Sequence, residues 1–277
     1  MNKLIGILIT ETSQVDEVVP FSNAVAFRAS DGAEIISYLS KIDNRLTPVI
    51  IVDPFFTVDG KYKHGHSRDL YDALEQSNHF GRIVFMFDEP MWRARKNDQP
   101  YEDVIKVMGD VKQNFRGVEI MHIEAYAELY QQYTENNGKL YLFYDADHIG
   151  FDCYGEYGSC GGLNVPELSQ FTYLDEIYKA IKNHGSSAKL FLVPGAFTSP
   201  DYPESEFDVI KQLQSYMYFF ENNFDKVSGL GAFLWGNTTL PDVTIIGARN
   251  NELIRKEIEE SFPKLGKKSN EFRLILD

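Results

Sequence analysis

The sequence predicts a (β/α)8 barrel formed by a single domain over residues 1–277. Three observations lead to this fold class. The chain has 277 residues, close to the ~250 that such a barrel needs. Eight apolar, β-rich runs recur along it, and the segments between them are long enough for a helix each. Alternating strands and helices indicate an α/β fold, and eight repeats favour a closed barrel over an open sheet.

The eight predicted strands are apolar on both faces, as expected of parallel strands that are covered by helices. They are Leu4–Thr10, Ala24–Arg28, Val49–Asp53, Arg82–Asp88, Val118–Ile123, His148–Tyr154, Lys189–Val193 and Gly231–Trp235. The sixth strand has an alternative position at Leu140–Tyr144. The later position is preferred because it puts Asp152 and Tyr154 at the C-terminal end of the strand, before a glycine-rich loop.

Amphipathic segments that fit helices lie between these runs. They are Ala33–Ile42, Ser67–Gln76, Tyr101–Phe115, Ala125–Asn136, Tyr173–Asn183, Glu204–Asn223 and Glu252–Phe262. Each would cover the sheet with its apolar face.

The composition bears on partners and location. A formal net charge of −14 and a pI of about 4.9 argue against nucleic acid and anionic membranes as partners, because both attract basic surfaces. The short apolar run at the start of the chain is interpreted as the first strand, so we expect a cytoplasmic protein, unless it is released by lysis or another non-classical route. Two cysteines, Cys153 and Cys160, do not make a disulfide framework.

Polar residues cluster just after the predicted strands, at the end of a barrel that carries the active site. They include Arg28, Asp53, Asp88, Glu89, Glu124, Asp152, Tyr154 and Asn237. Any one carboxylate could simply cap the helix that follows it. Several carboxylates converging on one pocket cost stability, which favours a functional role for the group.

Two adjacent carboxylates end the fourth strand, in the run FMFDEPMW over residues 85–92. A carboxyl group in such apolar surroundings can have a raised pKa and act as a general acid. The segment resembles the fourth strand of TIM-barrel glycoside hydrolases, in which a glutamate at the strand end is the acid or acid/base. That resemblance gives this role to Glu89. Asp88 and Glu89 also resemble the Asp-Glu pair of hexosaminidase-type barrels, where the aspartate assists the substrate's own acetamido group.

Two further segments resemble the same superfamily. The run ADHIGFDCYGEYG, residues 146–158, is similar to a strand-six pattern whose carboxylate and tyrosine line the sugar subsite. Asp147, Asp152 and Tyr154 fit that pattern. The run GLGAFLWGN, residues 229–237, is similar to the last strand of such barrels, where a tryptophan often forms the floor of the subsite for the scissile sugar. Trp235 fits that position.

The seventh predicted strand departs from the pattern. The commonest retaining barrels place a nucleophilic glutamate at its end, whereas the chain reads VPGAF over residues 193–197 and has no carboxylate there. Three alternatives follow: Asp152 or Glu124 supplies the second carboxylate, Asp88 supports substrate assistance, or the barrel is not catalytic. A carboxyl separation of ~5 Å would give retention, and roughly 6.5–9.5 Å would give inversion.

The resemblance implies a glycoside hydrolase that acts on a carbohydrate and needs no cofactor and no metal. We expect Glu89 to be the general acid and Asp152 to be the base or nucleophile. The residues expected to bind substrate lie at the ends of predicted strands. They are Asp88, Glu124, Tyr154, Trp235, Asp53 and Arg28.

Two other functions fit parts of the sequence. A non-catalytic carbohydrate-binding barrel would keep Trp235, Tyr154 and Trp92 as stacking residues and would use Glu89 only as a polar contact. A metal-dependent hydrolase would use the pair His64-Gly65-His66 with His122 and His148. In the metallo-hydrolase barrels that His-x-His pair lies on the first strand, whereas here it follows the third, which favours surface histidines.

Overall fold

The computed structural model describes residues 3–65, 68–77, 79, 81–154, 170–201, 206–240 and 243–276. Eight parallel strands form a closed barrel with the hydrogen-bonded order β1-β11-β9-β8-β7-β6-β3-β2. They are β1 Leu4–Ile9, β2 Ala24–Arg28, β3 Thr47–Ile51, β6 Val84–Asp88, β7 Glu119–Ala125, β8 His148–Cys153, β9 Lys189–Pro194 and β11 Val227–Ala232. The predicted (β/α)8 barrel is confirmed, as is the later of the two positions for the sixth strand.

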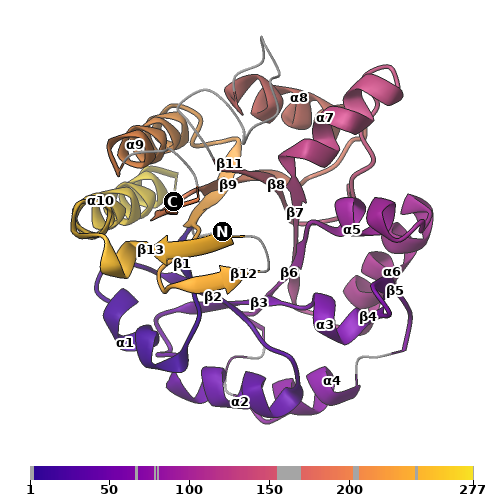
Figure 1. Cartoon of the computed structure of the whole chain (residues 1–277), viewed down its shortest axis with the longest axis horizontal. Helices are drawn as coiled ribbons and strands as arrows, with labels where there is room; N and C mark the ends of the chain where they lie inside the picture. The colour runs from indigo at the N-terminus through magenta and orange to yellow at the C-terminus, as the bar shows by residue number, and fades with distance from the viewer. Residues whose placement is uncertain are drawn as a thin grey trace. The chain divides into compact units, whose positions relative to one another are not determined.

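Helices follow most of these strands (Figure 1). They are α1 Val15–Val18, α2 Gly32–Lys41, α3 Asp53–Phe56, α4 Arg68–Glu75, α5 Pro90–Lys96, α6 Tyr101–Asn114, α7 Tyr126–Glu135, α8 Gln170–Asn183, α9 Glu206–Asn222 and α10 Glu252–Leu276. Two short 3-10 helices lie at Thr12–Gln14 and Ala248–Asn250. Among the residues that the structure describes, no helix combines the length and the apolar character needed to span a membrane.

The chain divides into two compact units, each built from separate segments. One consists of Met1–Ala26, Cys153–Tyr173 and Phe191–Asp277, and the other of Phe27–Asp152 and Leu174–Leu190. The expectation of a single domain over residues 1–277 stays a prediction.

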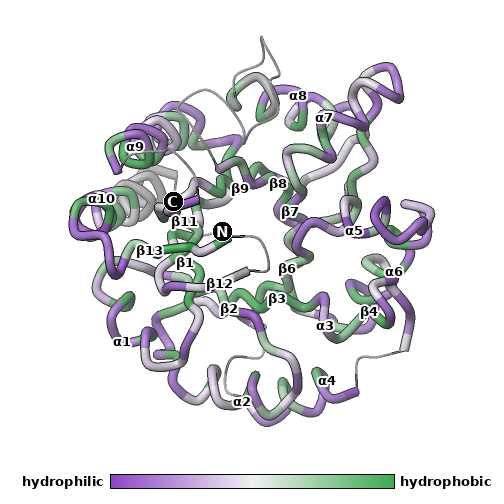
Figure 2. Tube along the Cα trace, in the orientation of Figure 1, coloured by the Kyte–Doolittle hydropathy of each residue, from purple (hydrophilic) through white to green (hydrophobic). Residues whose placement is uncertain are grey.

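The unit with Phe27–Asp152 holds β3, β6, β7 and β8 in parallel register. Asp88 pairs with Ile123, and Ala125 pairs with Asp152. Because paired residues on parallel strands share a face and alternate along each strand, Asp88 and Asp152 project from the same face of the sheet. Helices α4, α5 and α6 lie outside β3, β6 and β7 (Figure 1), and hydrophobic residues concentrate along β3 (Figure 2).

The other unit pairs β1 with β11, at opposite ends of the sequence. Leu4 lies beside Gly229, and a Cβ at Gly229 would collide with the backbone oxygen of Leu4 and the ring of Phe191. Glycine is therefore required where the two strands approach. The same unit carries a small antiparallel sheet in the order β10-β13-β12, formed by Phe197–Thr198, Val243–Gly247 and Thr238–Leu240.

Some predicted boundaries were wrong. The last strand was placed at Gly231–Trp235, whereas β11 spans Val227–Ala232. Its start was missed because Ser228 and Gly229, which belong to the strand, have low strand propensity. Helix α5 was not predicted. It begins at Pro90, and proline is favourable at the first helical position. Helix α10 continues through Pro263 instead of ending before it.

Cys153, the last residue of β8, is disulfide-bonded. Cys160, the other cysteine of the sequence, lies outside the described residues. The cytoplasmic location expected from the sequence stays a prediction.

Candidate active site

Four carboxylates from three parallel strands gather at the C-terminal ends of β3, β6 and β7, within the unit that holds Phe27–Asp152. Asp53 follows β3, Asp88 ends β6 with Glu89 directly after it, and Glu124 lies near the end of β7. This is the part of a (β/α)8 barrel where active sites form. Three side chains accompany them: Arg28 from β2, Arg93 from α5 and Tyr62 from β5 Lys61–Tyr62.

Glu89 joins β6 to α5 in a left-handed backbone conformation, with φ 53° and ψ 47°. This conformation is uncommon for residues other than glycine and often occurs at functional sites. The Glu89 N–H donates to the carbonyl of Ile123 at 2.7 Å, and its carbonyl accepts from the N–H of Arg93 at 3.0 Å. Its half-buried carboxyl group makes no hydrogen bond or ion pair with any residue in the described part of the chain.

The surroundings of Glu89 favour its protonated form. Burial, followed by the charges of Asp88 and Glu124, raises the pKa of Glu89 from 4.5 to about 7, against the opposing charge of Arg93. A carboxylic acid with this pKa holds a proton near neutral pH and can donate it to a leaving group.

Asp53 is almost completely buried, with 3% of its surface exposed. Its Oδ1 accepts a hydrogen bond from the Tyr62 hydroxyl, and its Oδ2 accepts from the backbone N–H of Asp88 at 3.1 Å. Burial and the charge of Asp88 raise the pKa of Asp53 to about 6. Burial and the Asp53 carboxylate also raise the pKa of Tyr62, so the phenol remains a donor.

Asp88 is held by two arginines. Its Oδ2 lies 2.9 Å from an Nη2 of Arg28 and 2.9 Å from that of Arg93. Arg93 also donates from Nε to the Asp88 carbonyl at 2.7 Å. These contacts fix the Asp88 carboxylate beside Glu89, and a role for Asp88 in substrate binding or catalysis stays a prediction.

Glu124 differs from the other three carboxylates because it has no exposed surface. Its Oε2 accepts from the N–H of Met91 at 2.9 Å, and its Oε1 accepts from the N–H groups of Trp92 at 3.2 Å and Ala125 at 2.8 Å. His122 Nε2 lies 3.2 Å from Oε2. All of these partners belong to the protein, which opposes a role for Glu124 as the second catalytic carboxylate.

Asp152 is half-buried near the end of β8. By the strand register it lies two strands across and two residues along from Asp88. Standard sheet spacings give a Cα separation of roughly 12 Å. Asp152 therefore shares a face of the sheet with Asp88, and its catalytic role stays a prediction.

The two aromatic residues expected to bind sugar, Tyr154 and Trp235, belong to the other unit. Tyr154 packs against Phe197 and Phe233, with ring centroids 5.4 and 5.0 Å away. Trp235 is 2% exposed and donates its indole N–H to Glu17 Oε2 at 2.9 Å. With so little exposed surface, Trp235 would need rearrangement around it before it could stack on a sugar. Sugar binding by either residue stays a prediction.

The histidines considered for a metal site have other partners. His64 pairs with Asp110, His122 with Glu124, and His148 with Glu119; His66 lies outside the described residues. In the portion of the chain that the structure describes, no group of three histidine, cysteine, aspartate or glutamate side chains could hold a metal.

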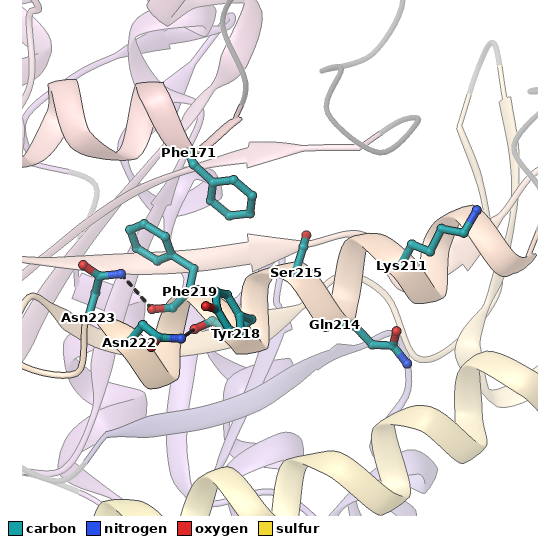
Figure 3. A pocket seen from close by; sticks show the side chains of 8 residues that line it. All are labelled: Phe171, Lys211, Gln214, Ser215, Tyr218, Phe219, Asn222 and Asn223. Carbon is teal, nitrogen blue, oxygen red and sulfur yellow. Dashed lines mark hydrogen bonds between the residues drawn. The ribbon is translucent and has the colours of Figure 1, made fainter.

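A separate hollow lies along α9, with a volume of about 540 Å³ (Figure 3). It is lined by Phe171 of α8, by Lys211, Gln214, Ser215, Tyr218, Phe219 and Asn222 of α9, and by Asn223. The amides of Asn222 and Asn223 donate to backbone carbonyls one turn earlier, at 2.8 and 3.1 Å. Its lining contains no carboxyl group, so it cannot supply acid/base chemistry between carboxylates.

Two residues of the cluster were not found from the sequence. Arg93 lies four residues after Glu89, one helical turn along α5, and would have been noticed had that helix been predicted. Tyr62 belongs to a hairpin, β4 Thr57–Val58 with β5, that gives no local signal of a role. Gln99 fixes Tyr62 in place by donating to its carbonyl and accepting from its N–H, both at 2.8 Å.

Comparisons with known proteins give structural neighbours only. No family model matches the chain, and no curated protein matches it in sequence. An endo-β-1,4-glucanase from Xanthomonas axonopodis pv. citri, solved as a triple mutant, is 12% identical, with a TM-score of 0.56 over 93% of this chain and 99% of its own. The chain shares the (β/α)8-barrel fold of this enzyme.

Two other neighbours agree with that fold. The catalytic domain of a mannanase from Streptomyces sp. SirexAA-E is 16% identical, with a TM-score of 0.52 over 87% of this chain and 78% of its own. XacCel5A, solved in complex with cellopentaose, is 12% identical, with a TM-score of 0.51 over 92% of this chain and 99% of its own. At these identities the likeness concerns the fold, and the chemistry has to be argued from the residues.

Proposed function

We propose that the protein hydrolyses glycosidic bonds, with Glu89 as the general acid. The observation that carries this proposal is the carboxyl group of Glu89: it has no partner among the described residues, lies at the C-terminal end of a barrel strand, and has a pKa raised to about 7. The solved structures with this fold that carry glucanase and mannanase names add support.

In this mechanism Glu89 donates its proton to the glycosidic oxygen as the bond to the anomeric carbon breaks. Asp88 is held by Arg28 and Arg93 and keeps a negative charge beside Glu89. Asp152 is the proposed second carboxylate, which either attacks the anomeric carbon or activates a water molecule. No cofactor takes part in either route.

The proposed substrate is a carbohydrate polymer or oligomer. A bound cellopentaose in one structural neighbour is the reason to begin with β-1,4-linked glucans, and the mannanase name of another is the reason to include mannans. Nucleic acid and membranes are not proposed as partners, because of the acidic charge of the chain.

The test is the release of new reducing ends from a panel of soluble β-1,4-glucans, mannans and their oligosaccharides. We expect the Glu89→Gln protein to be slower than wild type by at least about 100-fold, the scale of a lost general acid. The matched control is Glu102→Gln, which removes an exposed glutamate of α6 and should retain activity. A loss of tenfold or less on Glu89→Gln would remove Glu89 from this role.

The second candidate is a non-catalytic barrel that binds carbohydrate. The absence of a carboxylate in the segment VPGAF, residues 193–197, at the end of β9 favours it. Binding of the same oligosaccharides by calorimetry, without any release of reducing ends by the wild-type protein, would establish this alternative.

A further inference from the structure

The left-handed conformation at Glu89 has to be maintained by its surroundings, because a residue with a Cβ atom disfavours it. On the strand side, the Glu89 N–H extends the β6–β7 pairing by donating to Ile123. On the helix side, Pro90 begins α5 and has no N–H, so the next free donors of the helix are the N–H groups of Met91 and Trp92.

Both N–H groups donate to the same side chain, that of Glu124. The carboxylate of Glu124 accepts from Met91 through Oε2 and from Trp92 through Oε1, at 2.9 and 3.2 Å. Glu124 comes from the neighbouring strand β7, so this contact ties the start of α5 to the barrel. An anionic acceptor at a helix N-terminus is favourable because the helix dipole is positive there.

The Glu124 carboxylate is itself held in place. His122 Nδ1 accepts the N–H of Phe143 at 3.1 Å, which leaves the proton of the neutral imidazole on Nε2. That N–H then donates to Glu124 Oε2 at 3.2 Å. Ala125 gives a further backbone N–H to Oε1 at 2.8 Å, so four donors from the protein fix the carboxylate in a site closed to solvent.

We propose that Glu124 is a positioning residue that holds the turn at Glu89 by binding the first free N–H groups of α5. It contacts no substrate and acts through Glu89, so its catalytic effect rests on the proposed function. The two carboxyl groups therefore have different roles. Glu89 has an acid group without a partner among the described residues, and Glu124 fixes the backbone that positions this group.

The negative charge of Glu124 has a second effect at the same place. It adds to the charges of Asp88 and Asp53 that raise the pKa of Glu89, while Arg93 lowers it, and burial makes the largest contribution. Loss of the Glu124 charge should therefore lower the pH at which Glu89 titrates.

The test uses Glu124→Gln in the full chain, with Glu119→Gln as its matched control. Glu119 lies at the other end of the same strand and also contacts a histidine, His148, at 2.9 Å. In Glu124→Gln one carboxylate oxygen becomes an NH2 group, which cannot accept. We therefore expect the amide hydrogen of either Met91 or Trp92, whichever faces that group, to exchange at least about tenfold faster than in wild type, because a buried donor loses its acceptor. The carboxyl carbon of Glu89, followed by NMR, should titrate at a pH lower by about one unit.

The control should leave both measurements unchanged. Unchanged amide exchange at Met91 and Trp92, or an unchanged titration of Glu89, in a folded Glu124→Gln protein would overturn the proposal. If that variant does not fold, Glu124→Asp keeps the charge but shortens the side chain, and it should accelerate exchange while leaving the titration close to wild type. Neither measurement needs a substrate. If the wild-type protein hydrolysed no glycosidic bond, the proposed function would be refuted, but the amide exchange and the titration of Glu89 would still test whether Glu124 holds the turn.

Discussion

The raised pKa of Glu89 predicts that the free energy of unfolding falls as the pH rises and Glu89 ionises. Because burial and neighbouring carboxylates raise the pKa, the folded state prefers the protonated form. The resulting stabilisation is complete below about pH 4.5, the value for the unfolded chain, and is lost as the pH rises through about 7. At alkaline pH the folded protein must therefore carry an unfavourably ionised Glu89.

The magnitude follows from the two pKa values. The gap between 4.5 and about 7 corresponds to about 3 kcal/mol. Most of it, about 2 to 3 kcal/mol, develops between about pH 5 and about pH 8.5. Glutamine in place of Glu89 cannot ionise, so the free energy of unfolding of Glu89→Gln, relative to wild type, should increase by that amount across this range.

The assay is urea unfolding of wild type and Glu89→Gln at both pH values, followed by circular dichroism. Glu102→Gln, from the exposed face of α6, controls for the loss of one negative charge and should show a much smaller change between the two pH values. If the difference between Glu89→Gln and wild type were the same at both pH values, the acid would not be held in its protonated form by the fold.

Three further predictions concern stability. Tyr62→Phe removes a donor to buried Asp53 and should cost about 1 to 2 kcal/mol in urea unfolding; an unchanged midpoint would contradict that contact. Arg95→Met leaves the carboxylate of Glu128, which has no exposed surface, without its cation, and should cost about 3 kcal/mol or more by the same measurement. Gly266→Ala adds a methyl group with no atom within 4 Å in helix α10, and should raise stability by about 0.5 to 1 kcal/mol; a lower melting temperature would count against it.

The arrangement of strands was predictable because it depends on apolar runs and on their spacing. The choice of His148–Tyr154 over Leu140–Tyr144 for the sixth strand rested on the polar residues at its end, and it was right, since β8 covers His148–Cys153. The adjacent carboxylates of Asp88 and Glu89 were also visible, since both end an uninterrupted apolar run.

The contacts among those carboxylates were not predictable, because they depend on side chains from separate segments. Glu124 and Asp53 look alike in the sequence: each is an acid at a strand end. Glu124 meets the start of a helix that begins with Pro90, whereas Asp53 meets a phenol from a hairpin. Trp235 shows the same limit, since its 2% exposure comes from neighbours that no local pattern reveals.

The pairing of β1 with β11 has a consequence for the order of folding during synthesis. Leu4 cannot pair with Gly229 until the ribosome has synthesised Gly229. Most of the other unit, in contrast, is the continuous segment Phe27–Asp152. At a translation rate of about 5–20 residues per second, roughly ten seconds or more separate the synthesis of these two partners. During that interval one edge of β1 has no partner from β11, and apolar strand edges of this kind are the surfaces on which nascent chains aggregate and which chaperones protect.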